Sequence, residues 1–272
     1  MLLATWLKQA ETSLNKANIA TARLDSLILL EHCLKIDRSK LLANLDLEIS
    51  PSNLKTLNNV LKRRIKHEPI SYIVQKSYFY GRPFMVNSAV LEPRPESETM
   101  IERLLNLDLK LPNLRIADIG CGCGAIGITA ALELQTSAVD LIDIDKKALK
   151  VAKINVEKFT LNLSTIHSNL LSNWKDNYSV LLCNLPYVPD DFKINLAATH
   201  EPKLAIFGGK DGLDIYRQLF RQLKQLESKP LYILAESLPP QHQAMTTLAA
   251  NYGYKLVFED DFIQTFKLAK TD

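Results

Sequence analysis

A glycine-rich segment in the middle of the chain has the residue types of a loop that approaches a nucleotide-like ligand. The segment reads Asp118-Ile119-Gly120-Cys121-Gly122-Cys123-Gly124 and lies between a predicted strand and a predicted helix. Glycines at such a position let the backbone turn sharply and approach a ligand closely. Asp143 ends the next predicted strand, nineteen residues after Gly124, where a carboxylate can accept hydrogen bonds from ribose hydroxyls.

Asp118 separates two classes of ligand that the glycine loop by itself would allow. The loop also fits the looser pattern of dinucleotide-binding proteins, but a carboxylate beside it would repel a pyrophosphate. A carboxylate at the end of a buried strand needs a partner, and S-adenosylmethionine offers an ammonium group close to such a loop. The structural alternative is that Asp118 only ties down the glycine loop.

A second group of polar and aromatic residues follows the fourth predicted strand of this region. It reads Asn184-Leu185-Pro186-Tyr187. The Asn184 carbonyl and the backbone carbonyl of Leu185 could accept both hydrogens of a planar NH2 group, while the ring of Tyr187 covers its π face. Leu185 precedes a proline, which favours an extended backbone. The alternative is an ordinary strand-ending turn, in which Asn and Pro are common.

These residues require a sheet whose strand ends meet at one edge. Strands are predicted at 114–119, 138–143, 164–168, 179–184, 231–236, 255–259 and 262–268, and helices at 97–107, 125–134, 145–158, 211–227 and 240–252. This alternation is typical of an α/β fold with a mostly parallel sheet covered by helices on both faces. The last two strands are joined by about two residues, too few for a crossover, so they must pair antiparallel.

The region before this sheet has a different character. Residues 1–70 are predicted to form a small helical domain, with one helix starting at Ser50 and Pro51 in its first turn. Residues 71–97 contain aromatic and β-branched residues around Gly81-Arg82-Pro83, which predicts a β-hairpin, and then a proline-rich linker around Pro93 and Pro95. Residues 98–272 form the third part.

Composition excludes several classes of protein. The 272 residues are 47% apolar and 23% charged with a net charge of +3, which is ordinary for a globular chain and too weakly basic to indicate nucleic-acid binding. No apolar run is long enough for a membrane span, and the N-terminus does not resemble a signal peptide. Four cysteines at these spacings predict neither a disulfide framework nor a metal site, so we expect a cytoplasmic protein with reduced thiols.

Taken together, the motifs resemble the protein-(glutamine-N(5)) methyltransferases that act on peptide-chain release factors, the HemK-like family. The match extends over almost the whole chain. It includes Ala22–Asp25, Glu68–Ile73, Leu91–Glu98, Asp118–Gly127, Asn184–Tyr187, Glu201-Pro202, Gly208-Gly209 and Asp211–Asp214.

The resemblance implies a class I S-adenosylmethionine-dependent methyltransferase: a Rossmann-like seven-stranded sheet with its last strand antiparallel, preceded by the helical domain and the hairpin. It implies that Gly120–Gly124 and Asp143 hold S-adenosylmethionine, and that Asn169 and Leu170 flank its adenine. Asn184 and Tyr187 would hold the target glutamine, and residues 1–85 would help to dock the release factor.

The chain departs from the family pattern at several positions. Leu185 replaces the first proline of the usual Asn-Pro-Pro-Tyr, which preserves the backbone carbonyl. Asn169 stands where an acid is usual, and Leu170 where an aromatic residue is often found. The segment Ala235–Leu238 replaces the usual Glu-Ile-Gly strand end.

Three alternatives share part of this pattern. A ribosomal-protein glutamine methyltransferase has the same Asn-x-Pro-Tyr site. Ribosomal-RNA adenine dimethyltransferases also carry an Asn-Leu-Pro-Tyr tetrapeptide, but their helical domain follows the catalytic one, and direct nucleic-acid binding is not expected here. The third alternative is a non-catalytic module that binds S-adenosylmethionine or a release factor.

Overall fold

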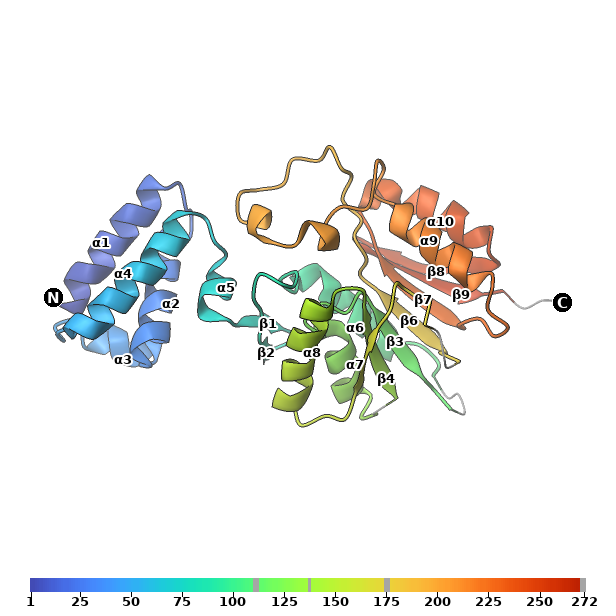
Figure 1. The fold of residues 1–272 in the computed structure, drawn as a ribbon, viewed down its shortest axis with the longest axis horizontal. Coiled ribbons are helices and arrows are strands. Elements are labelled where there is room, and N and C mark those ends of the chain that lie inside the picture. Colours follow the sequence, from blue (N-terminus) through green and yellow to red (C-terminus); the bar gives the residue numbers. More distant parts are fainter. Residues whose placement is uncertain (110–112, 137, 174–176, 270–272) are drawn as a thin grey trace. The chain divides into compact units, whose positions relative to one another are not determined.

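The computed structural model describes residues 1–109, 113–136, 138–173 and 177–269. The chain divides into two compact units (Figure 1). Unit 1 comprises Met1–Gln75 and Asn195–His200, and unit 2 comprises Lys76–Ile194 and Glu201–Asp272. Each unit buries a hydrophobic core of its own, so the two are described separately.

Unit 1 is a helical bundle, as the sequence predicts. Its helices are α1 (Leu3–Lys16), α2 (Ala22–Leu34), α3 (Arg38–Ala43) and α4 (Pro51–Ile65). Helix α4 begins where expected, because the Ser50 side chain accepts a hydrogen bond from the backbone N–H of Asn53 and Pro51 follows the cap. Trp6 and Leu57 are almost fully buried at the centre of the bundle.

A buried ion pair joins helices α2 and α4 and explains the Ala22–Asp25 motif. Arg64 Nε donates to Asp25 Oδ2 at 2.7 Å, and the two side chains are only 12% and 3% exposed. Asp25 also accepts a hydrogen bond from Thr21, while Arg64 donates to the backbone carbonyl of Glu68. The motif therefore contributes to the stability of the bundle.

We expect Asp25→Ala to destabilise unit 1 by about 2 kcal/mol, because it leaves the guanidinium of Arg64 buried without its charged partner. This loss is smaller than for a fully buried ion pair, since the side chain of Arg64 is 12% exposed. Hydrogen exchange of the α2 and α4 amides measures this loss. Arg23→Ala is the matched control, because its pair with Glu11 is 60% and 32% exposed and its removal should change little. Equal exchange in both variants would contradict the assignment.

The hairpin prediction is wrong at its start. Ile70–Val74 form a short helix, α5, and the hairpin consists only of β1 (Ser77–Phe79) and β2 (Arg82–Phe84). Pro69 precedes α5, and Ile73 packs in the core of unit 1. Packing of this turn on the bundle outweighs the strand propensity of its β-branched residues. The helix ends at Gln75, whose backbone is left-handed with φ of 54°.

Unit 2 contains a mixed sheet with the strand order β5-β4-β3-β6-β7-β9-β8. The strands are β3 (Ile116–Ile119), β4 (Val139–Asp143), β5 (Ser164–His167), β6 (Val180–Cys183), β7 (Tyr232–Glu236), β8 (Tyr254–Asp260) and β9 (Ile263–Leu268). Strands β3 to β7 are parallel, and β9 runs antiparallel to both of its neighbours. The predicted fold class, with its antiparallel last strand, is confirmed.

Helices cover both faces of this sheet. They are α6 (Glu98–Leu105), α7 (Ala125–Glu133), α8 (Lys146–Lys158), α9 (Asp214–Leu223) and α10 (His242–Ala250), with 3-10 turns at Pro95–Ser97, Lys203–Ala205 and Pro239–Gln241. Ala117 and Ile119 of β3 belong to the same hydrophobic cluster as buried residues of α9 and α10. Asp118 points to the opposite face, where it contacts α7, because side chains alternate along a strand.

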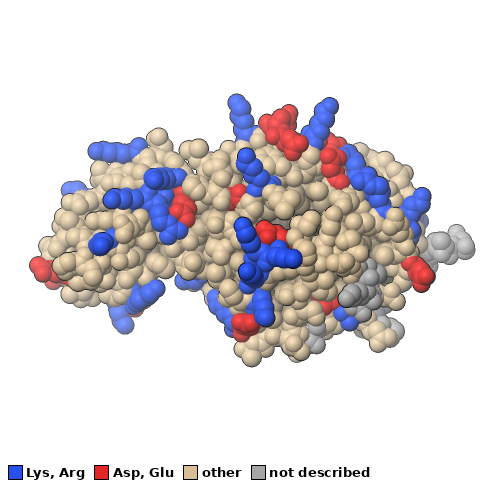
Figure 2. Space-filling view, viewed as in Figure 1, with Lys and Arg blue, Asp and Glu red and all other residues tan. Residues whose placement is uncertain are grey.

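Among the described residues, no helix has both the length and the apolar character needed to cross a bilayer. On the face drawn in Figure 2, Lys and Arg side chains stand in several separate groups with acidic side chains among them, in keeping with the small net charge.

Candidate active site

A cavity lies at the carboxyl ends of strands β3, β4 and β6 in unit 2. Its lining includes the glycine loop from Gly120 to Cys123, Asp143, Asn169 with Leu170, and Asn184 with Leu185 and Pro186. The linker segment 89–93, Ser97 and the turn residues Pro202, Leu204 and Ala205 are also among the lining residues. Residues chosen from the sequence as a cofactor loop and as a catalytic tetrapeptide therefore face one space.

The glycine loop runs from the end of β3 to the start of α7. Gly120 has φ of +73°, and a Cβ at this position would lie 3.1 Å from Cδ2 of Leu185. A side chain here would strain the backbone and press on the tetrapeptide, so glycine allows the two segments to approach. Burial raises the thiol pKa of Cys121 well above its usual range and that of Cys123 to about 12, so both are neutral, apolar parts of the loop.

Asp118 is buried beneath this loop and is not among the described residues that line the cavity. Its Oδ2 accepts a hydrogen bond of 2.8 Å from the backbone N–H of Gly127 in α7. Burial raises the pKa of Asp118 to about 7, against the lowering effect of that hydrogen bond. This contact ties the first turn of α7, just after the glycine loop, to β3, and a contact with the cofactor ammonium stays a prediction. Gly124 also lies outside the lining and precedes the first residue of α7.

Asp143 occupies the end of β4 and faces the cavity. Its Oδ2 accepts a hydrogen bond from the backbone N–H of Gly122 at 2.9 Å, and its Oδ1 accepts one from the N–H of Asp145 at 2.8 Å. Burial raises the pKa of Asp143. Each carboxylate oxygen has a second lone pair, so Asp143 can brace the glycine loop and accept hydroxyl groups of a ligand at the same time.

Asn169 and Leu170 follow β5 and line the same cavity. Leu170 adopts a left-handed backbone with φ of 53°. Gln222 of α9 holds this turn from behind: its Oε1 accepts from the N–H of Leu171 at 2.7 Å, and its Nε2 donates to the carbonyl of Asn169 at 3.3 Å. Sequence reasoning did not find Gln222, because nothing in a helical glutamine indicates a contact with a loop 51 residues away.

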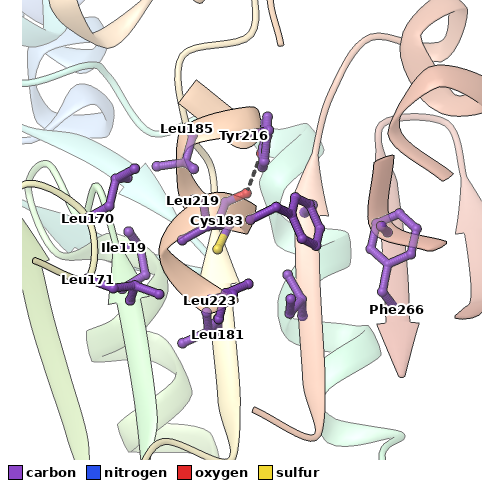
Figure 3. Packing of buried hydrophobic residues seen from close by; sticks show 14 of the residues in the cluster. Ile119, Leu170, Leu171, Leu181, Cys183, Leu185, Tyr216, Leu219, Leu223 and Phe266 are labelled. Carbon is purple, nitrogen blue, oxygen red and sulfur yellow. Dashed lines mark hydrogen bonds between the residues drawn. The ribbon is translucent and has the colours of Figure 1, made fainter. Parts of the chain in front are cut away.

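Leu185, the residue that departs from the family tetrapeptide, is a core residue. It is 2% exposed and belongs to the hydrophobic cluster drawn in Figure 3, which also contains Ile119 and Leu170. Nearby, the hydroxyl of Tyr216 lies 2.8 Å from the carbonyl of Cys183 (Figure 3). It also lies 2.6 Å from the carbonyl of Glu236, so it links the ends of β6 and β7. The tetrapeptide is thereby held from its apolar side.

A polar network holds the other side of the tetrapeptide. Asn184 Nδ2 donates to Ser97 Oγ at 2.9 Å, and Ser97 Oγ donates to Glu236 Oε2 at 2.6 Å. Tyr187 donates its hydroxyl proton to Glu236 Oε1 at 2.9 Å. Tyr187 is therefore directed at Glu236 and is not among the described residues that line the cavity. Neither Ser97 nor Glu236 was a predicted site residue, although a carboxylate at the end of a buried strand indicates a bound partner.

Gly208 and Gly212, which follow the tetrapeptide in the chain, pack against its backbone. A Cβ on Gly208 would lie 2.3 Å from the carbonyl oxygen of Pro186, and one on Gly212 would lie 2.0 Å from that of Tyr187. Gln241 Nε2 also donates to the carbonyl of Tyr187 at 2.7 Å. These contacts need glycine because two backbones meet without space for a side chain.

An ion pair joins two walls of the cavity. Arg94 Nη2 donates to Glu201 Oε2 at 2.6 Å, and the Glu201 side chain is only 2% exposed. Arg94 follows Pro93 in the linker, whereas Glu201 precedes Pro202 in the turn opposite. The pair therefore holds the linker against the turn that carries the Glu201-Pro202 motif.

Two family models match the chain in separate segments. The model described as PrmC N-terminal domain matches residues 5–74, and the model described as methyltransferase small domain matches residues 97–201. The first segment corresponds to the helical bundle, and the second contains the glycine loop, Asp143 and the tetrapeptide.

Named relatives cover most of the chain. A release factor glutamine methyltransferase from Bacillus cereus is 36% identical over 218 residues, which cover 77% of each chain. One from Coxiella burnetii is 34% identical over 237 residues, which cover 86% of each chain. Among solved structures, the hMettl16 catalytic domain superposes with a TM-score of 0.53 at 15% identity, covering 70% of this chain and 76% of that one, which shows the fold alone.

The architecture of unit 2, the cavity at its strand ends and the relatives agree on one assignment. S-adenosylmethionine is the cofactor that this fold and its methyltransferase domain imply, and the chain is a methyltransferase that depends on it. It belongs to the family of release factor glutamine methyltransferases.

Proposed function

We propose that the protein transfers a methyl group from S-adenosylmethionine to the side-chain amide nitrogen of a glutamine in a peptide-chain release factor. The observation that carries this proposal is the position of Asn184, Leu185 and Pro186 in the same cavity as the glycine loop and Asp143. An acceptor of amide hydrogens and a binding loop for the methyl donor thus share one space. The names of the relatives support the release factor as substrate.

The residues of the cavity fit S-adenosylmethionine. Asp143 presents a carboxylate for the ribose hydroxyls, and the backbone of Gly120 to Gly122 leaves room for close approach. Asn169 and Leu170 would lie against the adenine, with Leu170 supplying an apolar contact in place of an aromatic ring. When bound, the cofactor supplies an electrophilic methyl group on a sulfonium.

The tetrapeptide can prepare an amide nitrogen for this transfer. An amide nitrogen is a poor nucleophile, because its lone pair is delocalised into the carbonyl. Hydrogen bonds from the amide hydrogens to Asn184 Oδ1 and to the carbonyl of Leu185 raise the electron density on nitrogen and fix its direction. Positioning of this kind contributes as effective molarity. The amide proton becomes strongly acidic as the new bond to nitrogen forms and can leave to water, so Asp118 and Asp143 need not act as bases.

Three other assignments are compatible with parts of this site. A ribosomal-protein glutamine methyltransferase would use the same tetrapeptide, a ribosomal-RNA adenine methyltransferase would use it on a base, and a non-catalytic binding module would transfer nothing. The test is incubation of the protein with S-adenosylmethionine and purified release factors or ribosomal subunits, followed by mass mapping. We expect one methylated glutamine in the release factor; methyl groups only on a ribosomal component, or none, would reject the proposal.

We further propose that unit 1 docks the protein substrate and takes no part in holding the cofactor. The described residues that line the cavity all belong to unit 2. All four cysteines have free thiols, and we propose the cytoplasm as the place where the protein acts.

A shortened chain beginning at Lys76 should bind S-adenosylmethionine with the affinity of the full chain. Its methylation of the release factor should fall by roughly tenfold or more, because remote contacts that orient the substrate are lost. The cut keeps hairpin β1–β2, whose Phe84 packs on Phe159 with ring centroids 5.0 Å apart. Calorimetry with the cofactor controls for folding. Methylation at the full rate by a shortened chain that binds cofactor normally would reject the docking role.

A further inference from the structure

The side-chain amide of Asn184 has two ends of the same shape, and only its oxygen suits an incoming amide NH2 group. An Asn side chain rotated by half a turn would place its own NH2 group against the hydrogens of the substrate. Such a rotation removes an acceptor and adds a repulsive contact. The site therefore needs a contact that decides which end of Asn184 faces the cavity.

Ser97 makes that contact but cannot decide by itself. A hydroxyl group can donate one hydrogen bond and accept others, so it can bond to either end of an amide. Its proton, however, goes to Glu236 Oε2 at 2.6 Å. An ionised carboxylate only accepts hydrogen bonds, so Ser97 is left with lone pairs for Asn184. Asn184 must then turn its Nδ2 toward Ser97, and the structure places Nδ2 at 2.9 Å from Ser97 Oγ.

We propose that Glu236, acting through Ser97, is a positioning residue that keeps Oδ1 of Asn184 facing the substrate amide. The inference rests on the proposed glutamine methyltransferase activity. Ser97 and Glu236 are 1% and 0% exposed, so water cannot easily replace either partner. Tyr187 donates to the second oxygen of the same carboxylate at 2.9 Å, so Glu236 accepts hydrogen bonds both from the last residue of the tetrapeptide and from Ser97, which contacts the first.

The protonation state of Glu236 should therefore affect turnover. Burial raises the pKa of Glu236 to about 7, whereas Ser97 and Tyr187 stabilise the carboxylate; of the charged groups nearby, Glu96 raises this pKa and Arg94 lowers it. A protonated Glu236 can itself donate a hydrogen bond, so either Ser97 or Tyr187 must then accept from it instead of donating to it. If Ser97 accepts from Glu236, its own proton turns toward Asn184, which then places Oδ1 toward Ser97 and away from the substrate. The turnover number should thus fall as the pH is lowered through this pKa.

The first test removes the Ser97 hydroxyl group, which links Glu236 to Asn184, and then restores it. Ser97→Ala should lower kcat for release-factor methylation by about tenfold, since nothing then fixes the acceptor, while cofactor affinity stays at the parent value. Ser97→Thr retains the hydroxyl group and should recover most of the rate. Tyr178→Phe is the matched control, because it removes another buried hydroxyl-to-carboxylate hydrogen bond, that of Tyr178 to Asp140 at 2.7 Å. Neither residue is among the described residues that line the cavity, so kcat should stay near the parent value.

The second test separates positioning from a structural role by its pH profile. Glu236→Gln keeps the shape but cannot titrate, and its amide can bond to Ser97 through either end. Its kcat at saturating cofactor should be lower than that of the parent at pH 8 and should lack the decline on the acid side. Asp118→Asn removes another buried carboxyl with a pKa of about 7 and, whatever its rate, should keep that decline.

A third measurement needs no substrate. The side-chain NH2 signal of Asn184 in an NMR spectrum, assigned by its loss in Asn184→Asp, should exchange slowly in the parent and faster in Ser97→Ala. Parent exchange rates in Ser97→Ala, or a parent kcat and pH profile in both Ser97→Ala and Glu236→Gln, would overturn the positioning role. If the parent methylates no release factor but the NMR result holds, the proposed function fails and the Ser97–Asn184 contact stands.

Discussion

Replacing Asn184 with alanine should lower the turnover number by about 10²-fold or more. The substitution removes the acceptor that directs the substrate amide, and one preorganised polar contact in an active site typically has an effect of this size. Cofactor affinity should change much less, because Asp143 and the glycine loop are untouched. Steady-state kinetics on a purified release factor, together with calorimetry for the cofactor, measure the two effects separately.

Asn184→Asp is the matched variant, because it keeps an acceptor of the same shape and adds a negative charge. That charge stabilises the sulfonium ground state more than the transition state, in which the positive charge is being lost. Turnover should fall although the cofactor binds at least as tightly as in the parent. If Asn184→Ala methylates the release factor at the parent rate, Asn184 is only a residue of a strand-ending turn. The proposed function would then lose its central support.

Asp143→Ala should weaken the binding of S-adenosylmethionine by roughly 2–4 kcal/mol, the loss expected for two charge-assisted hydrogen bonds to a buried ligand. Part of this loss could come from the loop, since the same carboxylate accepts the backbone N–H groups of Gly122 and Asp145. Calorimetry with the intact cofactor measures the total. An unchanged affinity would reject the assignment of Asp143 to the ribose.

A double-mutant cycle separates the two contributions. The second change in the cycle is made in the ligand, with an analogue of S-adenosylhomocysteine that lacks one ribose hydroxyl. In the parent, the loss of that hydroxyl should weaken binding; in Asp143→Ala, it should have little further effect. Independent, additive losses would mean that Asp143 acts only by supporting the glycine loop.

Much of the candidate site could be predicted from the sequence, because its residues follow strands of one parallel sheet. The carboxyl ends of such strands meet at a single edge, so the glycine loop, Asp143 and Asn184 had to lie near one another once the strands were assigned. The antiparallel pairing of the last two strands followed from the shortness of their connection. Local spacing was sufficient in both cases.

Other features depend on packing between distant segments. The start of the hairpin was wrong because residues 70–74 gain more from burial on the bundle as a helix than their strand propensity indicates. Asp118 fits a cofactor contact in the sequence, yet in the fold its carboxylate accepts from Gly127 beneath the loop. The glycines at 208 and 212 read as a motif, but only the fold gives their reason, which is contact with the tetrapeptide backbone.

The hydrogen bonds that join Asn184 to Ser97 and Ser97 to Glu236 are the clearest case of a feature that tertiary structure alone decided. Ser97 lies 87 residues before Asn184 in the chain, and Glu236 lies 139 residues after Ser97. The sequence established which residue types could accept an amide and that they share one edge of the sheet. Which end of Asn184 faces the substrate depends on the direction of two hydrogen bonds among buried groups, and that direction exists only when the linker, β6 and β7 have packed together.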